Sequence, residues 1–193
     1  MKRNIIIVAL LQVLFLCGMV AAKQYTLETG EPVLLETQPI DPRSLFRGDY
    51  VRLDYAINNI NLDAVAGDDA FERHDDVYVV LEKDGPYHRP VAVYNNEPAA
   101  SGETVVIRGR VRAVSDRRWN PETRKMEQVP NVTVRYGIEN YFVPEGTGRE
   151  LELRWRDGEE KRVDIRVAVD RFGKAGIKAV LVNGEERYVE TLF

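Results

Sequence analysis

From Pro32 onward, apolar and polar residues alternate along most of the chain, which is the pattern of strands that bury one face. The first such run places Val51, Leu53, Tyr55 and Ile57 on one face of a strand. Further strands are predicted at Val77–Leu81, Val91–Tyr94, Val105–Arg112, Asn131–Ile138, Val163–Val169 and Ile177–Val182. No amphipathic helix long enough for a crossover separates these strands, so parallel β-α-β units are excluded and antiparallel sheets are expected.

Turn residues mark where several of these strands end. Asn183-Gly184, followed by a strand at Glu186–Val189, is the strongest short hairpin signal in the chain. Gly109, inside an arginine-bearing strand, predicts a bulge or a close approach of another segment. The segments Asp63–Asp76 and Ser115–Pro130 are polar and rich in turn residues, and both are predicted to be loops.

One segment carries two competing patterns. Residues 151–155 alternate like a strand, but Thr147 and Glu150 have the spacing of a capping box and Gly158 stands where a helix would end. We therefore predict a short helix at residues 147–158. The resulting fold class is mainly β, an antiparallel β-sandwich or small barrel with one short helix, preceded by an N-terminal transmembrane or signal helix.

The N-terminal segment has the composition of a membrane anchor or signal sequence. Lys2 and Arg3 precede an uncharged run from Asn4 to Ala22. Eighteen residues rise about 27 Å as a helix, just short of a bilayer's hydrocarbon thickness. The basic end is expected to stay in the cytoplasm, so the body would face the other side of the membrane. The expected division is a signal anchor at 1–22 and a β-rich domain at 23–193. Cleavage before Lys23 and retention of the anchor both remain open.

Charge and cysteine content narrow the chemistry of the body. The formal charge of the 193-residue chain is −4, and losing residues 1–22 would make it −6, so no global basic field exists for nucleic acid. Cys17 is the only cysteine, which leaves the body without disulfides, thiol nucleophiles or cysteine zinc ligands. The His/carboxylate cluster at Glu72–Asp76 lacks metal-ligand spacing. No metal and no cofactor is expected.

The segment from Asp41 to Tyr55 contains Gly48-Asp49-Tyr50, two free positions, Leu53, one free position and Tyr55. This run resembles the signature of the GDYXXLXY family of bacterial membrane-anchored proteins. Two further runs, Tyr136–Glu139 and Tyr141–Gly146, resemble the second block of that family. The resemblance implies an N-terminal anchor, an extracytoplasmic β-rich domain, a multi-pass membrane protein as a neighbour and no assigned activity.

The signature residues divide into two predicted roles. Structural roles are expected for Gly48, Asp49, Leu53 and Tyr55, with the Tyr55 ring in the core and its hydroxyl on a hydrogen-bond partner. A lip that binds a partner is expected from Arg47, Tyr50 and Arg52. The predicted function is that of an accessory or interaction domain that serves a polytopic membrane protein. The predicted location is the bacterial inner membrane, with a single span and the body facing the periplasm.

Two alternatives stay open at this stage. The first is a divergent envelope hydrolase or peptidase. Gly48-Asp49-Tyr50-Val51 is similar to the Gly-Asp strand of signal peptidases, but the serine-methionine pair expected before it is replaced by Gln38-Pro39-Ile40-Asp41. No catalytic residue is assigned. The second alternative is a domain that binds a small ligand or lipid, which requires an open apolar cavity. Independently of these alternatives, Arg108, Arg110 and Arg112 and the basic residues in the segment after them could contact anionic headgroups near the anchor.

Overall fold

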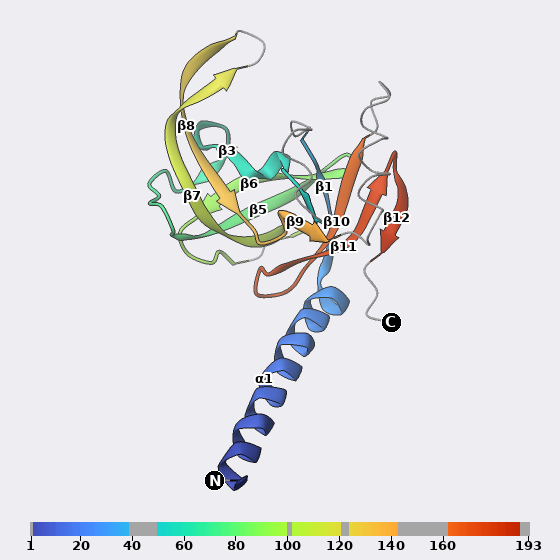
Figure 1. Ribbon diagram of the computed structural model, residues 1–193. Coiled ribbons are helices and arrows are strands. Elements are labelled where there is room, and N and C mark those ends of the chain that lie inside the picture. Colours follow the sequence, from blue (N-terminus) through green and yellow to red (C-terminus); the bar gives the residue numbers. More distant parts are fainter. Residues whose placement is uncertain (1, 39–49, 100–101, 121–123, 143–161, 190–193) are drawn as a thin grey trace.

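A long helix precedes a body of β-strands in the computed structural model, which describes residues 2–38, 50–99, 102–120, 124–142 and 162–189 (Figure 1). Arg47, Gly48, Asp49 and the helix predicted at 147–158 lie outside these residues. The described strands form antiparallel sheets and no closed barrel, so the sandwich-like alternative of the predicted fold class applies.

The smaller of the two main sheets contains four antiparallel strands in the order β1-β10-β11-β12. These strands are β1 (Glu31–Glu36), β10 (Val163–Val169), β11 (Ala175–Val182) and β12 (Glu185–Val189). The predicted hairpin after β11 is confirmed. Asn183 and Gly184 have φ of 53° and 84°, the left-handed conformation that a tight two-residue turn requires at both positions.

The larger sheet contains six strands in the order β3-β8-β7-β5-β6-β4. They are β3 (Asn59–Asn61), β4 (Ala66–Gly67), β5 (Asp76–Asp84), β6 (Tyr87–Tyr94), β7 (Val105–Asn120) and β8 (Lys125–Arg135). All pairs are antiparallel except the two-residue pairing of β4 with β6. A separate ribbon pairs β2 (Tyr50–Arg52) with β9 (Asn140–Phe142).

The inward residues of both main sheets form one hydrophobic cluster, because alternation along each strand turns every second side chain to the same side. The cluster includes Val33, Leu35, Val77, Val79, Leu81, Ile107, Ile165 and Val167. Gly109 lies where β7 approaches β8 closely. A Cβ added there would lie 2.3 Å from Val134 Cγ1, which confirms the predicted close approach.

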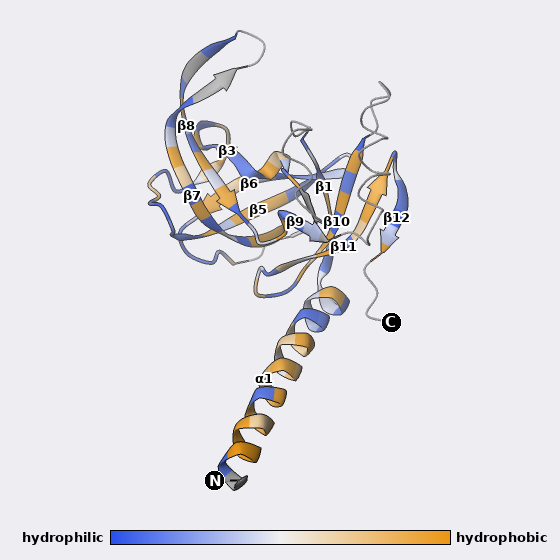
Figure 2. Cartoon of the chain, viewed as in Figure 1, coloured by the Kyte–Doolittle hydropathy of each residue, from blue (hydrophilic) through white to orange (hydrophobic). Residues whose placement is uncertain are grey.

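The N-terminal helix α1 (Lys2–Thr29) is long enough to cross a membrane, and Figure 2 shows that most of it is apolar. Its large apolar residues from Ile5 to Val20 are exposed. It continues without a break through Ala22 and Lys23 as far as Thr29. Its C-terminal turns contact the body, where Leu27 is buried. Leu27 packs over Gly176 of β11.

The loop predicted at Ser115–Pro130 is wrong, because most of this segment belongs to the β7–β8 hairpin. Residues from Arg112 to Arg117 are all exposed, so neither face of this part of β7 carries the apolar alternation that marks a strand. A register shift between Ser115 and Arg117 further interrupts the period. In Figure 1 the outer end of the hairpin lies at the opposite end of the molecule from the N-terminus of α1.

The strand predicted through Ile57 also differs from the structure. β2 ends at Arg52, and a 3-10 turn, η2 (Ala56–Asn58), follows the isolated bridge residue Tyr55. The Asn58 side-chain Oδ1 accepts from the Tyr55 N–H at 2.6 Å, which replaces a strand hydrogen bond by a local one. A second 3-10 turn, η3 (Leu62–Ala64), begins the largely irregular segment predicted as a loop at 63–76.

Candidate functional site

Two segments that are distant in sequence are joined by reciprocal tyrosine hydrogen bonds. Tyr55 is fully buried and its hydroxyl donates to the carbonyl oxygen of Ile138 at 2.7 Å. The Tyr136 hydroxyl donates in the other direction, to the carbonyl oxygen of Ile57 at 2.8 Å. Burial, with the negative charge of Glu139 as a smaller cause, raises the pKa of both tyrosines well above its ordinary value, so both stay protonated donors.

The Glu139 side chain organises the turn beside these tyrosines. Its Oε1 accepts from the Tyr136 N–H at 2.6 Å, and its Oε2 accepts from the N–H of Gly137 at 3.0 Å. Gly137 has a φ of 82°, which favours glycine at this position of the turn. Buried Asn58 donates to the Val134 carbonyl at 2.8 Å and, at 3.4 Å, to Glu139. Asn58 therefore links η2 to β8 and to the turn at Tyr136–Glu139, which we call the Glu139 turn.

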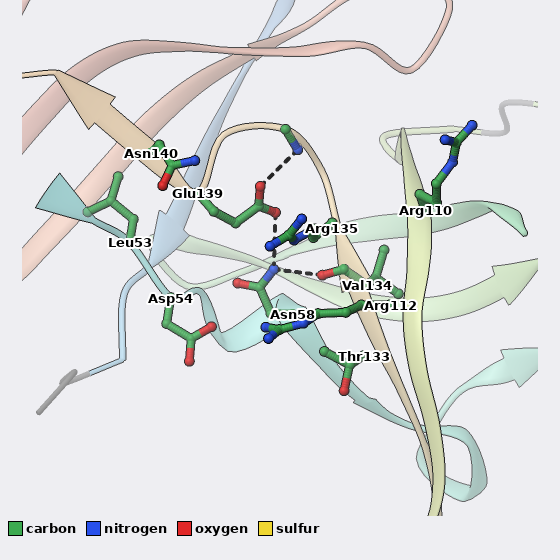
Figure 3. A pocket seen from close by; sticks show the side chains of 11 residues that line it. Leu53, Asp54, Asn58, Arg110, Arg112, Thr133, Val134, Arg135, Glu139 and Asn140 are labelled. Atoms are coloured by element: carbon green, nitrogen blue, oxygen red, sulfur yellow. Dashed lines mark hydrogen bonds between the residues drawn. The ribbon is translucent and has the colours of Figure 1, made fainter. Parts of the chain in front are cut away.

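A cavity of about 520 Å³ opens over this linkage (Figure 3). We call it the arginine pocket. Its lining consists of Leu53, Asp54, Asn58, Arg110, Arg112, Thr133, Val134, Arg135, Gly137, Glu139 and Asn140. The floor is thus formed by the hydrogen-bonded segments after β2 and after β8, while the wall comes from β7 and β8. Three arginines and two carboxyl groups make this lining polar, with a formal excess of one positive charge.

The arginines of this pocket lie on two neighbouring strands, β7 and β8. Arg110 and Arg135 are directly paired across β7 and β8, an arrangement in which like charges oppose each other. Arg110 lies 3.5 Å from an oxygen of Asp76, whereas the guanidinium groups of Arg112 and Arg135 make no hydrogen bond or ion pair with the residues described. A closer bond from Arg108, at 2.7 Å, is the main cause of the lowered pKa of Asp76.

A second cavity of about 410 Å³, the junction cavity, lies where α1 meets the body. Met19, Lys23 and Thr26 of α1 line it together with Asn140 and Tyr141 of β9. The other lining residues are Gly137, Ile138, Lys174, Ala175, Gly176 and Ile177. The two cavities share Gly137 and Asn140, so they lie on either side of the same turn.

The predicted site residues that the structure describes lie in β2 or shortly after it. Tyr50 and Arg52 lie in β2, where their backbones pair with Phe142 and Asn140 of β9. Leu53 is buried in the core. Its N–H donates to the Glu139 carbonyl at 2.8 Å, so the signature segment continues directly into the floor of the arginine pocket.

Sequence reasoning did not assign roles to Asn58, Arg135 or Glu139. Glu139 ends the run Tyr136–Glu139 of the second block, two residues after Gly137, and this place in the block was the available signal. Asn58 could have been noticed as a polar residue, prone to local turns, that follows the inward run ending at Ile57. Arg135 had no comparable signal, because its importance comes from its partner across the sheet.

No catalytic arrangement is assembled by the described part of the chain. Ser115 lies on the exposed hairpin and bonds the backbone of Arg117, whereas Ser44 is outside the described residues. His88 Nδ1 accepts from the Leu34 N–H at 3.3 Å, and burial lowers the pKa of this imidazole. Within the described ranges, no three His, Cys, Asp or Glu side chains form a group that could hold a metal ion.

Comparison with known proteins adds one positive finding. The sequence model of a family described as GDYXXLXY protein matches residues 12–180, which is most of the chain. Neither the curated proteins nor the solved structures provide a match.

Proposed function

Since the chain belongs to the GDYXXLXY family, in which no activity is assigned, we propose a function from its architecture: it is a single-pass membrane protein with an extracytoplasmic interaction domain. The partner is a polytopic protein of the same membrane. The domain works by presenting the β2–β9 ribbon to that partner and carries out no chemistry of its own.

The properties of α1 support the membrane location. The helix exposes its apolar side chains and carries Lys2 and Arg3 at its N-terminal end, which favours a cytoplasmic N-terminus. Retention of the anchor is supported by the unbroken helix across Ala22 and Lys23. Its last turns pack on the body instead of forming a flexible linker.

The observation that carries the proposal is the position of the ribbon. Asn140 and Tyr141 of β9 line the same cavity as Met19 and Lys23 of α1. Neighbouring strands lie about 5 Å apart, so β2, which pairs with β9, is held close to the point where α1 leaves the membrane. Arg52 in β2 pairs directly with Asn140. A partner embedded in the same bilayer can therefore reach this ribbon without crossing the rest of the body.

Photo-crosslinking in native membranes tests the contact. A photoreactive amino acid at Tyr50 or Arg52 of the full-length protein should capture an integral membrane protein. The same amino acid at exposed Arg117, on the hairpin directed away from α1, should not capture it (Figure 1). Tyr50→Ala and Arg52→Glu should reduce recovery of that partner by pull-down. Equal capture from all three positions, or no integral partner, contradicts the proposal. A cytoplasmic reporter signal after Phe193 contradicts its topology.

A second candidate function is the binding of a small anionic ligand, favoured by the direct pairing of Arg110 with Arg135 beside Arg112. A carboxylate or phosphate group between these arginines would relieve their repulsion and accept bidentate hydrogen bonds. Phosphate or citrate should then raise the melting temperature of the wild type but not of Arg112→Gln or Arg135→Gln. Arg187→Gln is the control, since Arg187 pairs with Glu185 in β12. Equal effects in all variants would reject the site.

A further inference from the structure

We infer that the β10–β11 turn, residues Asp170–Lys174, is a membrane-contact element that places Phe172 among the lipids and cationic side chains against anionic headgroups. This inference rests on the proposed spanning of the membrane by α1. We call the element the 170–174 turn.

The helix determines the height of this turn above the hydrocarbon layer. About 20 helical residues span the roughly 30 Å of hydrocarbon, so a segment that starts at Asn4 reaches the outer boundary near Lys23. Thr26 lies three residues further, about 4.5 Å above that boundary. The headgroup region of one leaflet is about 5–7 Å thick, so Thr26 falls inside it. The buried Thr26 hydroxyl donates to Asp170 Oδ2 at 2.6 Å, which places the start of the turn at the same level.

Internal hydrogen bonds hold the turn in this position. Asp170 Oδ1 accepts from the N–H groups of Phe172 at 2.9 Å and Lys174 at 3.1 Å. Gly173 has a φ of 73°, and its carbonyl accepts from the N–H of Arg108 in β7 at 2.7 Å. The turn is therefore bonded both to α1 and to the larger sheet, so it cannot swing away from the membrane surface independently of the body.

The exposed side chains of the turn have the chemistry of the interfacial region. Phe172 is 56% exposed, although it is large and apolar. The Arg171 guanidinium lies 4.6 Å from the centre of its ring. An exposed phenylalanine can bury its ring at the boundary between headgroups and acyl chains, and long cationic side chains can reach the headgroups. Lys174 is also exposed, and Lys23 of α1 lines the same junction cavity as Lys174.

The occupant is an anionic lipid surface. The whole chain carries a formal charge of −4, so its overall field repels such a surface and any attraction has to be local. Within the turn, Arg171 and Lys174 supply two positive charges against the carboxyl group of Asp170, and Lys23 of α1 lines the junction cavity together with Lys174. Arg117 and Arg118, in the outer half of the β7–β8 hairpin, are less suited to this role, because the outer end of that hairpin lies far from α1 (Figure 1).

A fluorophore attached at single cysteines of the full-length protein in nanodiscs measures insertion of the turn. Phe172→Cys, made with Cys17→Ser, should give blue-shifted emission that lipids brominated near the headgroup quench. Asn183→Cys is the matched control, because it lies at the opposite end of β11, about 25 Å along the strand. Its emission should resemble that of a dye in water. Equal, water-like emission from both positions overturns the inference.

A third label separates this inference from the proposed function. Phe15→Cys lies in the middle of α1, so deeply brominated lipids should quench its dye if the helix spans the bilayer. Quenching at residue 15 without quenching at residue 172 rejects the membrane contact alone. Absence of quenching at residue 15 rejects the span and, with it, both proposals.

The anionic preference has its own test. Energy transfer from the dye at residue 172 to labelled phosphatidylglycerol should exceed transfer to labelled phosphatidylcholine. Each positive charge near the surface should enrich the anionic lipid about fivefold. Arg171→Gln combined with Lys174→Gln should therefore remove most of the difference in energy transfer between the two lipids. Arg187→Gln, a distant exposed arginine of β12, should leave it unchanged. A preference that the double substitution leaves undiminished rejects the cationic part of the inference.

Discussion

Tyr55 and Tyr136 exchange hydroxyl hydrogen bonds between the two family blocks. The Tyr55 hydroxyl donates to the carbonyl of Ile138, two residues after Tyr136. The Tyr136 hydroxyl donates to the carbonyl of Ile57, two residues after Tyr55. Because both hydroxyls are buried, the carbonyl oxygens have no access to water as a replacement donor. This exchange holds the signature segment against the Glu139 turn and thereby positions the β2–β9 ribbon and the floor of the arginine pocket.

Tyr55→Phe or Tyr136→Phe should lower the free energy of unfolding by about 1–3 kcal/mol, since each leaves a buried acceptor without its donor. Chemical denaturation of the full-length protein in mild detergent measures the loss. Tyr94→Phe is the control, because the Tyr94 hydroxyl makes no hydrogen bond to the described residues. The double variant should lose less than the sum of the single losses, because both bonds connect the same two segments. Strict additivity would contradict this coupling.

Thr26→Val should loosen the attachment of α1 while keeping the shape of the side chain. The substitution removes the donor to Asp170 and should cost about 1–3 kcal/mol, because the bond is buried. Hydrogen–deuterium exchange should rise in residues 24–30 and 170–176 and stay unchanged in β5. Thr29→Val is the comparison, since the exposed Thr29 hydroxyl bonds within the helix, to the Tyr25 carbonyl. Unchanged exchange in both segments would show that this bond does not hold the helix.

Gly109→Ala should destabilise the β7–β8 pair. The added methyl group would lie 2.3 Å from Val134 Cγ1 and 2.9 Å from the Arg135 carbonyl oxygen, so one strand has to move. Overpacking of this kind costs about 1–3 kcal/mol. Thermal unfolding measures the loss, and Val134→Ala should restore part of it in the double variant by removing the closest atom. A double variant less stable than Gly109→Ala would show that the steric explanation is wrong.

His88 predicts a pH dependence of stability. Burial lowers its pKa from the ordinary value of 6.5, so the folded protein favours the neutral ring that accepts from the Leu34 N–H. As the pH falls through 6.5, the unfolded chain binds a proton first, and stability decreases until the lowered folded pKa is reached. The stability lost between about pH 7 and about pH 5 should be smaller in His88→Asn, which keeps an acceptor but cannot be protonated. Identical pH profiles would contradict the prediction.

The alternating pattern predicted those strands that bury one face against the core. The bounds of β10 agree with the prediction, and the Asn183-Gly184 turn adopts the two positive φ values that its residue types favour. Both successes depend on information within a few neighbouring residues. The outer half of the β7–β8 hairpin was missed for the same reason, because a strand exposed on both faces has no apolar period to detect.

The candidate site was only partly accessible from the sequence. The signature marked the segment around Leu53 and Tyr55, and parity predicted that both side chains point inward. The partner of the Tyr55 hydroxyl, Ile138, lies 83 residues away, so no local pattern could identify it. The same holds for Arg135, whose significance depends on its register opposite Arg110.

The sequence alone determined that the chain has an apolar N-terminal helix, a β-rich body and a family signature, because each of these is recorded in the order of neighbouring residues. Only the tertiary structure decided that Thr26 bonds Asp170, that Tyr55 and Tyr136 exchange hydrogen bonds, and which side chains line the two cavities. These contacts depend on how distant segments pack into one core, and that packing is settled by the whole chain at once.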